Sequence, residues 1–381
     1  ERFVLDDGWF KGRNDDTRAL GDWTPDPAKY PQGLGPLIDH VTERGMAFGL
    51  WVEPEMVNPE SELYKSHPEW TLNCDPLPRD TGRNQLVLDL SRKAVSDYLF
   101  EMLDGLLTAH PISYLKWDMN RDLTTAGRQG RAAYHSQVEA LYALIDRLRS
   151  AHPTVEIETC ASGGARIDAG ILARTHRVWT SDGNDALERQ KIQRGFSLFF
   201  PPEIMGSHVG PAHSHTTGRH LPLEFRGLTA FAGHMGMEMD LRELNPEEVE
   251  RLKAIIAAHK AQRHLLHTGR CLRLNPADIG RLGWGVVSED RKAAIYGIMQ
   301  VETPAPGASL RVLLPGLDPQ AQYRIRPLLP MDGGTAVFPQ PALPWIEEGL
   351  LATGQLLAGA GVNIALPNPA TGILLKAVVE G

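Results

Sequence analysis

The stretch Tyr114-Leu115-Lys116-Trp117-Asp118-Met119-Asn120-Arg121 joins a short apolar run to a cluster of polar side chains directly behind it. Its first four residues have the length and composition of a β-strand. Barrel and open-sheet enzymes keep their reactive side chains at the carboxyl ends of parallel strands. The stretch therefore predicts a strand and, directly after it, a candidate reactive carboxyl in Asp118.

Outward from this stretch, other short apolar runs also end in acidic or small residues. Between these runs lie stretches whose apolar residues have the spacing of a helix, as in Leu34–Val41 and Val138–Leu148. This alternation predicts an α/β fold with a parallel sheet. The further predicted strands are Phe3–Leu5 before Asp6 and Asp7, Met46–Val52 before Glu53, Val155–Glu158 before Cys160, Val178–Trp179 before Asp182, Ser197–Phe200 before Glu203, and a strand near Met235–Met237.

The amino-acid composition and the apolar pattern change after a predicted helix from Pro246 to His267, which Asn245 can cap and Gly269 can end. The remainder is rich in Gly and Pro and contains alternating strand-like runs. We therefore predict a (β/α) domain at residues 1–270 and a small antiparallel β domain at residues 271–381. The alternating runs are Ala293–Ile298, Ser309–Leu314 and Gln322–Ile325.

Composition narrows the class of protein. The chain has 381 residues, 42% of them hydrophobic, and a formal net charge of −8, which argues against a nucleic-acid partner or an anionic membrane surface. No apolar run reaches the roughly 20 residues of a membrane span. The 3 cysteines show no CxxC spacing, which excludes a disulfide scaffold and a zinc finger and favours reduced thiols in the cytoplasm.

Two of the strand-end carboxyl groups suit glycoside hydrolysis, which needs one acid and one nucleophile or base. Lys116 is expected to keep Asp118 ionised, as a nucleophile requires. The indole of Trp179 is expected to desolvate Asp182 and keep it protonated, as an acid requires. Asp185 lies in a similar setting and stays open as the alternative acid.

Tryptophans cluster near these acids, and their flat faces either pack on a sugar ring or fill the core. Both interpretations stay open from the residues alone. The four residues are Trp9, Trp51, Trp117 and Trp179.

In order along the chain, six motifs resemble the α-galactosidases (melibiases) of glycoside hydrolase family 36. The resemblance runs from residue 1 to about residue 270 and implies a (β/α)8 TIM-type barrel followed by an antiparallel β-sandwich. It also implies a retaining exo-α-galactosidase that acts on melibiose and raffinose and needs neither cofactor nor metal. The motifs are Leu5-Asp6-Asp7-Gly8-Trp9-Phe10, Gly49-Leu50-Trp51-Val52-Glu53-Pro54-Glu55-Met56, Gly82-Arg83-Asn84-Gln85, Lys116-Trp117-Asp118-Met119-Asn120-Arg121, Glu158-Thr159-Cys160-Ala161-Ser162-Gly163-Gly164 and Trp179-Thr180-Ser181-Asp182.

The resemblance assigns roles residue by residue. It makes Asp118 the nucleophile and Asp182 the acid/base. It also implies a set of residues that bind the sugar. Asp6 and Asp7 would bind its far hydroxyls, Trp51 would pack beside it, Arg83, Lys116 and Asn120 would donate hydrogen bonds to it, and Cys160 and Gly163 would line the pocket near the 2-position.

The chain departs from the family pattern at its beginning. Family members carry an N-terminal β domain and a first barrel strand ahead of the Asp-Asp-Gly-Trp segment, and nothing precedes Glu1 here. The predicted strands are one short of an eight-stranded barrel. We therefore expect a fragment of a longer enzyme. A homo-oligomeric state of the full-length form stays an open alternative.

Other functions stay open beside this one. The same scaffold suits an α-N-acetylgalactosaminidase or a galactosyl transferase, although Cys160 and Gly163 favour a free 2-hydroxyl. The chain could also be an inactive sugar-binding fragment. Many histidines lie between His208 and His220, where a metal-dependent hydrolase is the weaker interpretation and a loop at the pocket entrance the stronger.

Overall fold

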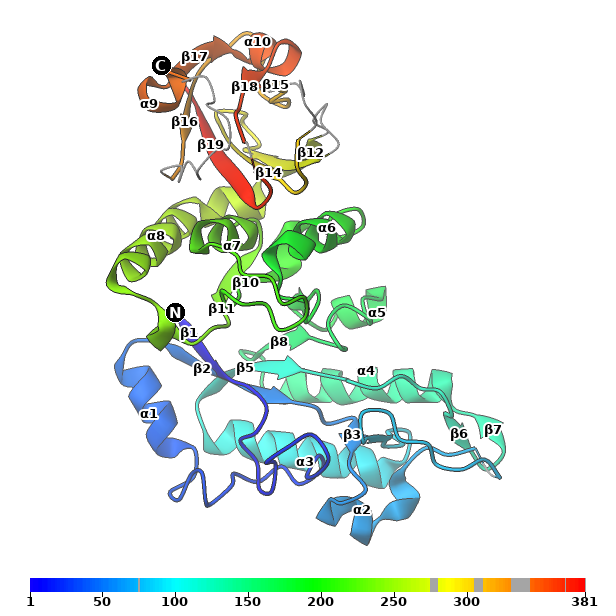
Figure 1. Cartoon of the computed structure of the whole chain (residues 1–381). Coiled ribbons are helices and arrows are strands. Elements are labelled where there is room, and N and C mark those ends of the chain that lie inside the picture. The colour runs from blue at the N-terminus through cyan, green and yellow to red at the C-terminus, as the bar shows by residue number, and fades with distance from the viewer. Residues whose placement is uncertain (75, 275–279, 305–310, 330–342, 367, 381) are drawn as a thin grey trace. The chain divides into compact units, whose positions relative to one another are not determined.

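The computed structural model describes residues 1–74, 76–274, 280–304, 311–329, 343–366 and 368–380. They form two compact units, Glu1–Trp179 and Thr180–Gly381 (Figure 1). This division falls elsewhere than the boundary expected at residue 270, which stays a prediction. Within the described residues, no helix combines the length and apolar character needed to cross a membrane.

The first unit is built on parallel strands that pair in chain order, with the sequence of neighbours β1-β2-β5-β8-β9. β2 is buried along almost its whole length, as expected for a strand covered on both faces. Parallel pairing brings the carboxyl ends of these strands to one edge. The strands are β1 (Arg2–Leu5), β2 (Ala47–Val52), β5 (Ile112–Trp117), β8 (Glu156–Thr159) and β9 (Arg177–Trp179).

Helices and short hairpins connect these strands. The apolar spacing at Leu34–Val41 forms α1, and the spacing at Val138–Leu148 forms α4, which lies beside α3 (Figure 1). The core side of α4 includes Leu144, whereas Val138 is exposed. The connecting elements are α1 (Gly35–Glu43), β3 (Met56–Val57), α2 (Glu62–Ser66), η1 (Pro68–Trp70), β4 (Leu86–Val87), α3 (Lys93–Ala109), β6 (Gly127–Arg128), β7 (Arg131–Ala132), α4 (Tyr134–Ala151) and α5 (Ala169–Leu172).

The second unit begins with further β/α elements, in which β10 and β11 pair in parallel. The helix expected from Pro246 is confirmed as α8, with a capping box formed by Asn245 and Glu248. These elements are α6 (Ala186–Phe196), η2 (Pro202–Ile204), β10 (Met205–Val209), α7 (Leu223–Ala230), β11 (His234–Met237), η3 (Leu241–Glu243) and α8 (Pro246–Thr268).

The strand predicted at Ser197–Phe200 is wrong. These residues continue the last turn of α6, because the N–H groups of Leu198 and Phe199 donate to carbonyls at positions 195 and 196. Phe199 is 83% exposed, unlike a buried strand residue. A short apolar run cannot by itself distinguish a strand from a helix end. The strand lies further on, as β10, and Glu203 belongs to η2 instead of a strand end.

The rest of the second unit is the antiparallel β domain expected from the sequence. Within the part of this domain that the structure describes, the main sheet has 6 strands in the order β12-β13-β14-β19-β16-β17, and β15 pairs with β18. Of the run predicted at Ser309–Leu314, residues 309 and 310 lie outside the described residues. The elements are β12 (Arg270–Leu274), β13 (Arg281–Val287), β14 (Ala293–Gln300), β15 (Arg311–Val312), β16 (Gln322–Pro327), α9 (Trp345–Glu348), β17 (Leu350–Thr353), α10 (Gly354–Gly359), β18 (Val362–Asn363) and β19 (Thr371–Val379).

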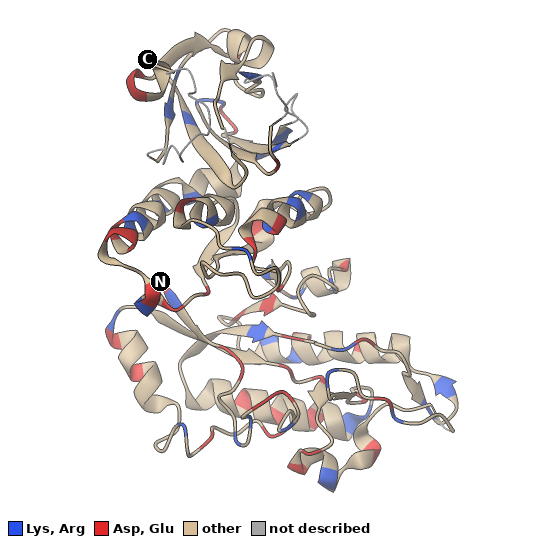
Figure 2. Ribbon diagram, in the orientation of Figure 1, with Lys and Arg blue, Asp and Glu red and all other residues tan. Residues whose placement is uncertain are grey.

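Charged side chains of both signs are interspersed on the helices, as Figure 2 shows for α8. On that helix Arg251 pairs with Glu247, one turn earlier (3.1 Å). Such exposed pairs contribute only about 0.3–0.5 kcal/mol each. The fold therefore depends on its apolar cores, one around the parallel strands of the first unit and others in the second.

Candidate active site

Asp118 lies directly after β5 and is 6% exposed. Its carboxyl accepts hydrogen bonds at both oxygens. Oδ1 accepts from the backbone N–H of Met119 (2.8 Å), and Oδ2 accepts from the indole Nε1 of Trp51 (3.1 Å) and the amide Nδ2 of Asn120 (2.8 Å). Because all three partners are N–H donors, the side chain is held in one orientation as an acceptor, as a carboxylate is.

Lys116, on the same strand, pairs with Asp6 (Nζ to Oδ2 2.7 Å), so the cation expected to act on Asp118 has another carboxylate as its partner. Burial opposes the charge of Lys116, but the Asp6 carboxylate outweighs burial and raises the pKa of the lysine. The ammonium also lies 5.9 Å from the ring centroid of Trp179. Lys116 is therefore a fixed cation at the strand ends, beside an exposed carboxylate.

Asp7 faces a different partner from Asp6. Its carboxylate pairs with the guanidinium of Arg13 (2.8 Å), whose side chain is only 5% exposed. Its backbone N–H donates to Oδ1 of Asp6 (2.8 Å). The two neighbouring acids at the end of β1 thus pair with different cations, and both carboxylates are exposed.

Arg83 reaches the same cluster from a tight turn. Gly82 and Gln85 exchange backbone hydrogen bonds, and the two residues between them have positive φ, 49° at Arg83 and 60° at Asn84. Non-glycine residues seldom adopt this conformation, and such strain is often found at functional sites. The turn directs Nη1 of Arg83 to Oδ1 of Asn120 (2.6 Å).

Cys160 and Gly163 lie together beyond β8, and both are buried. The backbone N–H of Gly163, which has φ +84°, donates to Sγ of Cys160 (3.4 Å). Burial raises the pKa of the thiol, the nearby Asp118 carboxylate raises it further, and Lys116 acts in the opposite direction. Cys160 is therefore a neutral thiol that lies near both Asp118 and Lys116.

The four tryptophans at the strand ends are buried, with exposed fractions between 0% and 2%. Trp9 donates its indole N–H to the carbonyl of Trp51 (2.9 Å), and Trp117 donates to Glu55 (2.9 Å). All four indole rings are therefore packed inside the protein. Trp51 is the one for which the structure gives a direct hydrogen bond to Asp118.

The two candidate acids lie in the second unit and differ sharply. Asp182 is exposed, in contrast to the desolvated setting expected for it. Asp185 is 1% exposed and caps α6, accepting from the backbone N–H groups of Leu187 (2.8 Å) and Glu188 (3.2 Å). It also accepts from Thr217 and from Arg219 (3.1 Å). Burial opposes ionisation, but these donors outweigh burial and lower the pKa of Asp185.

Glu53, the acid that follows β2, is not among the site residues predicted from the sequence. Glu53 is fully buried and accepts from the backbone N–H of Asn120 (Oε1, 2.5 Å) and from the amide of Gln85 (Oε2, 3.2 Å). Burial, together with the negative charge of Asp118, raises its pKa to about 8. Ser162, also not selected, donates to Oδ1 of Asn120 (3.1 Å). The signal available in the sequence was the position of both residues within the quoted motifs.

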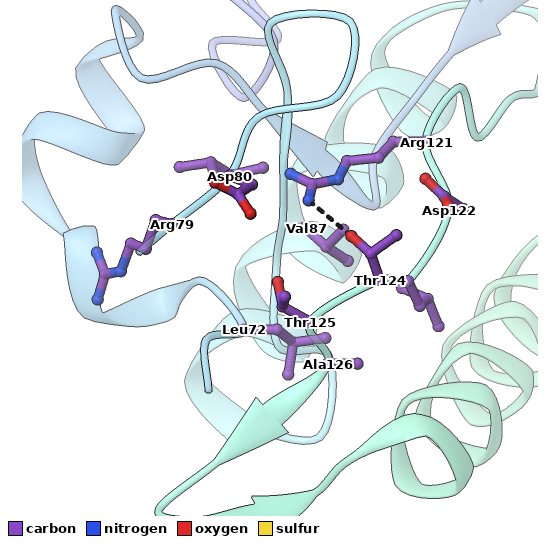
Figure 3. Close-up of a pocket in the computed structure, with 11 residues that line it drawn as sticks. Leu72, Arg79, Asp80, Val87, Arg121, Asp122, Thr124, Thr125 and Ala126 are labelled. Carbon is purple, nitrogen blue, oxygen red and sulfur yellow. Dashed lines mark hydrogen bonds between the residues drawn. The ribbon is translucent and has the colours of Figure 1, made fainter. Parts of the chain in front are cut away.

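Arg121 points toward a separate pocket (Figure 3). Its guanidinium donates to Oγ1 of Thr124 (3.4 Å) and to the carbonyl of Gln85 (2.6 Å). The predicted site residues lie outside the pocket lining. The pocket is lined by Leu72, Arg79, Asp80, Leu86, Val87, Arg121, Asp122, Leu123, Thr124, Thr125 and Ala126.

The histidine-rich stretch begins on a strand and continues into a loop. His208 lies on β10 and pairs with Glu238 (3.2 Å), and the backbones of His213 and His220 form an isolated antiparallel β-bridge. Within the described parts of the chain, no group of three or more His, Cys, Asp or Glu side chains is arranged to hold a metal ion.

Family comparison accounts for this arrangement. The melibiase family model matches residues 1–269, and the model of the glycosyl hydrolase family 36 C-terminal domain matches residues 282–374. The chain belongs to glycoside hydrolase family 36, the melibiases. Its barrel-type β/α elements and antiparallel β domain are those of this family, as the resemblance implied.

Curated relatives and solved structures agree with the family. The α-galactosidase of Escherichia coli is 46% identical over 98% of this chain, and α-galactosidase AgaA of Geobacillus stearothermophilus is 42% identical over 92%. The crystal structure of AgaA matches with a TM-score of 0.90 and 38% identity over 100% of this chain, and a variant of it was solved in complex with raffinose. The chain spans about half of these relatives, 54% and 49% of their lengths.

Proposed function

We propose that the protein is a retaining exo-α-galactosidase that removes terminal α-linked galactose from oligosaccharides such as melibiose and raffinose. The observation that carries the proposal is the setting of Asp118, oriented by Trp51, Asn120 and Met119 at the end of β5 in a member of family 36. A carboxylate held by N–H donors at a strand end is prepared to attack an anomeric carbon. The raffinose complex of a relative supports the substrate class.

The mechanism follows from two carboxyl groups with different tasks. Asp118 attacks the anomeric carbon and forms a β-linked galactosyl ester, while Asp182 gives its proton to the leaving glycosidic oxygen. Asp182, now ionised, takes a proton from a water molecule that attacks the anomeric carbon, which breaks the bond to Asp118 and releases galactose with its α configuration. A retaining pair of this kind lies about 5–5.5 Å apart, against roughly 6.5–9.5 Å for inversion.

Asp182, and not Asp185, is the better proton donor. Asp185 is an ionised cap of α6 that is engaged by two backbone N–H groups, Thr217 and Arg219. A carboxyl whose pKa is lowered in this way carries no proton to donate near neutral pH. The exposed carboxyl of Asp182 is accessible to a substrate and to water.

The remaining residues suit recognition of a galactosyl unit. Asp6 and Lys116 offer an acceptor and a donor side by side, and Asp7 adds a further acceptor for the far hydroxyls. Asn120 and Arg83 supply donors next to Asp118. Trp51 would support the sugar from beside the nucleophile. Cys160 and Gly163, packed against each other, leave a small 2-position pocket, which supports a free 2-hydroxyl over an acetamido group.

Azide rescue tests the two roles. Asp118→Ala should abolish hydrolysis of every substrate, and azide should restore turnover with β-galactosyl azide as the product, because the anion attacks from the vacated face. Asp182→Ala should keep a fast first step only for substrates with good leaving groups, and azide should then give the α-galactosyl azide. Proton NMR of the products distinguishes the anomers.

Asp185→Ala is the matched control. If it gives the α-azide pattern while Asp182→Ala hydrolyses raffinose normally, the acid is assigned wrongly. Inverted galactose from the unmodified protein would contradict the retaining mechanism itself.

A further inference from the structure

Glu53 lies in the second layer of the candidate site, one hydrogen bond away from the residues around Asp118. Its Oε1 accepts from the backbone N–H of Asn120 at 2.5 Å, and the side chain of the same Asn120 donates to Asp118 at 2.8 Å. Oδ1 of Asn120 also accepts hydrogen bonds from the side chains of Arg83 and Ser162. One backbone contact therefore fixes the residue through which three side chains of the site are connected.

We propose that Glu53 is a positioning residue, which fixes the backbone of Asn120 and thereby sets the distance between the Asn120 amide and Asp118. This proposal rests on the proposed function only for its kinetic consequences. The effect of Glu53 on the distance between Asn120 and Asp118 does not depend on which reaction the protein catalyses. Glu53 is fully buried, so it does not reach a substrate, and its hydrogen bond to the Asn120 N–H is the contact through which it positions the site.

Glu53 is fully buried and accepts hydrogen bonds from two uncharged donors, the Asn120 N–H and the Gln85 amide, which favours the protonated form of its carboxyl. Among the described residues, the side-chain oxygen of Gln85 is buried without a hydrogen-bond partner, although the Gln85 amide lies against Oε2 of Glu53 (3.2 Å). A hydroxyl at Oε2 could donate to that oxygen only if the Gln85 amide turned over, which would place the Gln85 NH2 in the same unpartnered position. One buried polar atom of Gln85 is therefore unpaired in either orientation, and burial and charge are what favour the proton on Glu53.

The charges around Glu53 agree with a neutral acid. Asp118, at the end of β5, faces it with a negative charge, and Arg13, in the loop after β1, is the cation that acts on it. Arg13 is already paired with Asp7, and Arg121 is occupied at the Gln85 carbonyl. A proton on Glu53 thus keeps a second negative charge away from the nucleophile without an ion pair.

Glu53→Ala and Glu53→Gln test the proposal together. The alanine variant removes the acceptor for the Asn120 N–H, so its crystal structure should show the Asn120 Nδ2 to Asp118 Oδ2 distance lengthened from 2.8 Å to beyond 3.5 Å. Its kcat on nitrophenyl α-galactoside should fall about 100-fold, since a displacement near 1 Å has that effect. Glu53→Gln can accept from Asn120 and donate to Gln85, and should restore both the distance and the rate to within about 3-fold of the unmodified protein.

Glu55 supplies the matched control, since it is buried on the same segment but accepts from Trp117 and Arg166. Glu55→Ala should lower the free energy of unfolding without lengthening the hydrogen bond between Asn120 Nδ2 and Asp118 Oδ2. Equal lengthening in both alanine variants, or none in Glu53→Ala, overturns the proposal. Should Glu53→Ala fail to fold, Glu53→Met takes its place, since it keeps the chain length but accepts nothing from Asn120.

Infrared difference spectroscopy tests the proton without any assay of activity. The carbonyl band of a protonated carboxyl should be present at neutral pH and absent in Glu53→Gln. If the protein hydrolyses no galactoside, the proposed function fails, while the distance in Glu53→Ala and this band still decide the role of Glu53. A band unchanged in Glu53→Gln contradicts the neutral acid.

Discussion

Two aspartates three residues apart, Asp182 and Asp185, have opposite environments and should respond differently to removal. Asp185→Ala removes the N-cap of α6 and the partner of Arg219, so the free energy of unfolding should fall by about 1–2 kcal/mol. Asp182→Ala removes an exposed side chain and should change it by less than about 0.5 kcal/mol. Urea unfolding at neutral pH measures both values.

The stability lost in Asp185→Ala should depend on pH. The pKa of Asp185 is lowered from its ordinary 3.8 in the folded state, so its stabilisation is present above that value and is lost as pH falls through the lower folded pKa. The gap between the unmodified protein and Asp185→Ala should therefore narrow below pH 3.8. A gap that stays constant through this range would mean that the cap contributes without its charge.

At the scale of the helix, two glycines give opposite expectations. Gly105 lies in α3 with open space where a Cβ would be, so Gly105→Ala should raise the free energy of unfolding by about 0.5–1 kcal/mol. Gly227 lies in α7, where a Cβ would meet Cδ1 of Ile255 on α8 at 2.7 Å. Gly227→Ala should lower the same free energy by about 1–3 kcal/mol, because the α7–α8 contact is overpacked. Thermal unfolding of the two variants compares them, and stabilisation by both would show that α7 and α8 can move apart at little cost.

For the whole molecule, the question is whether these 381 residues turn over a galactoside, since they span about half of the relatives' lengths. We expect hydrolysis of nitrophenyl α-galactoside on the order of 1–10³ per second, as is typical of enzymes. The N-acetyl analogue should react more slowly, because Cys160 and Gly163 pack closely. Galactose binding without turnover would favour the sugar-binding fragment, and faster reaction of the analogue would favour an α-N-acetylgalactosaminidase. Loss of activity with a chelator would favour the metal-dependent alternative.

The sequence by itself determined the order of strands and helices, because apolar periodicity and end signals are local. The capping box of α8 at Asn245 and Glu248 and the strand before Asp118 are examples. Its clear failure, Ser197–Phe200, was local too, since an apolar run at a helix end resembles a strand until its hydrogen bonds are known. The family motifs are local patterns as well, and the site residues that they imply stay predictions.

Only the tertiary structure decided which of these residues are partners, because partners are set by neighbours distant in sequence. Lys116 pairs with Asp6 across 110 positions, when the sequence suggested Asp118 two positions away. The strand-end tryptophans are buried, and Asp185 caps α6. Glu53 became visible only when its burial and its bond to Asn120 were known, since the charge of a carboxyl depends on solvent and contacts that no local pattern records.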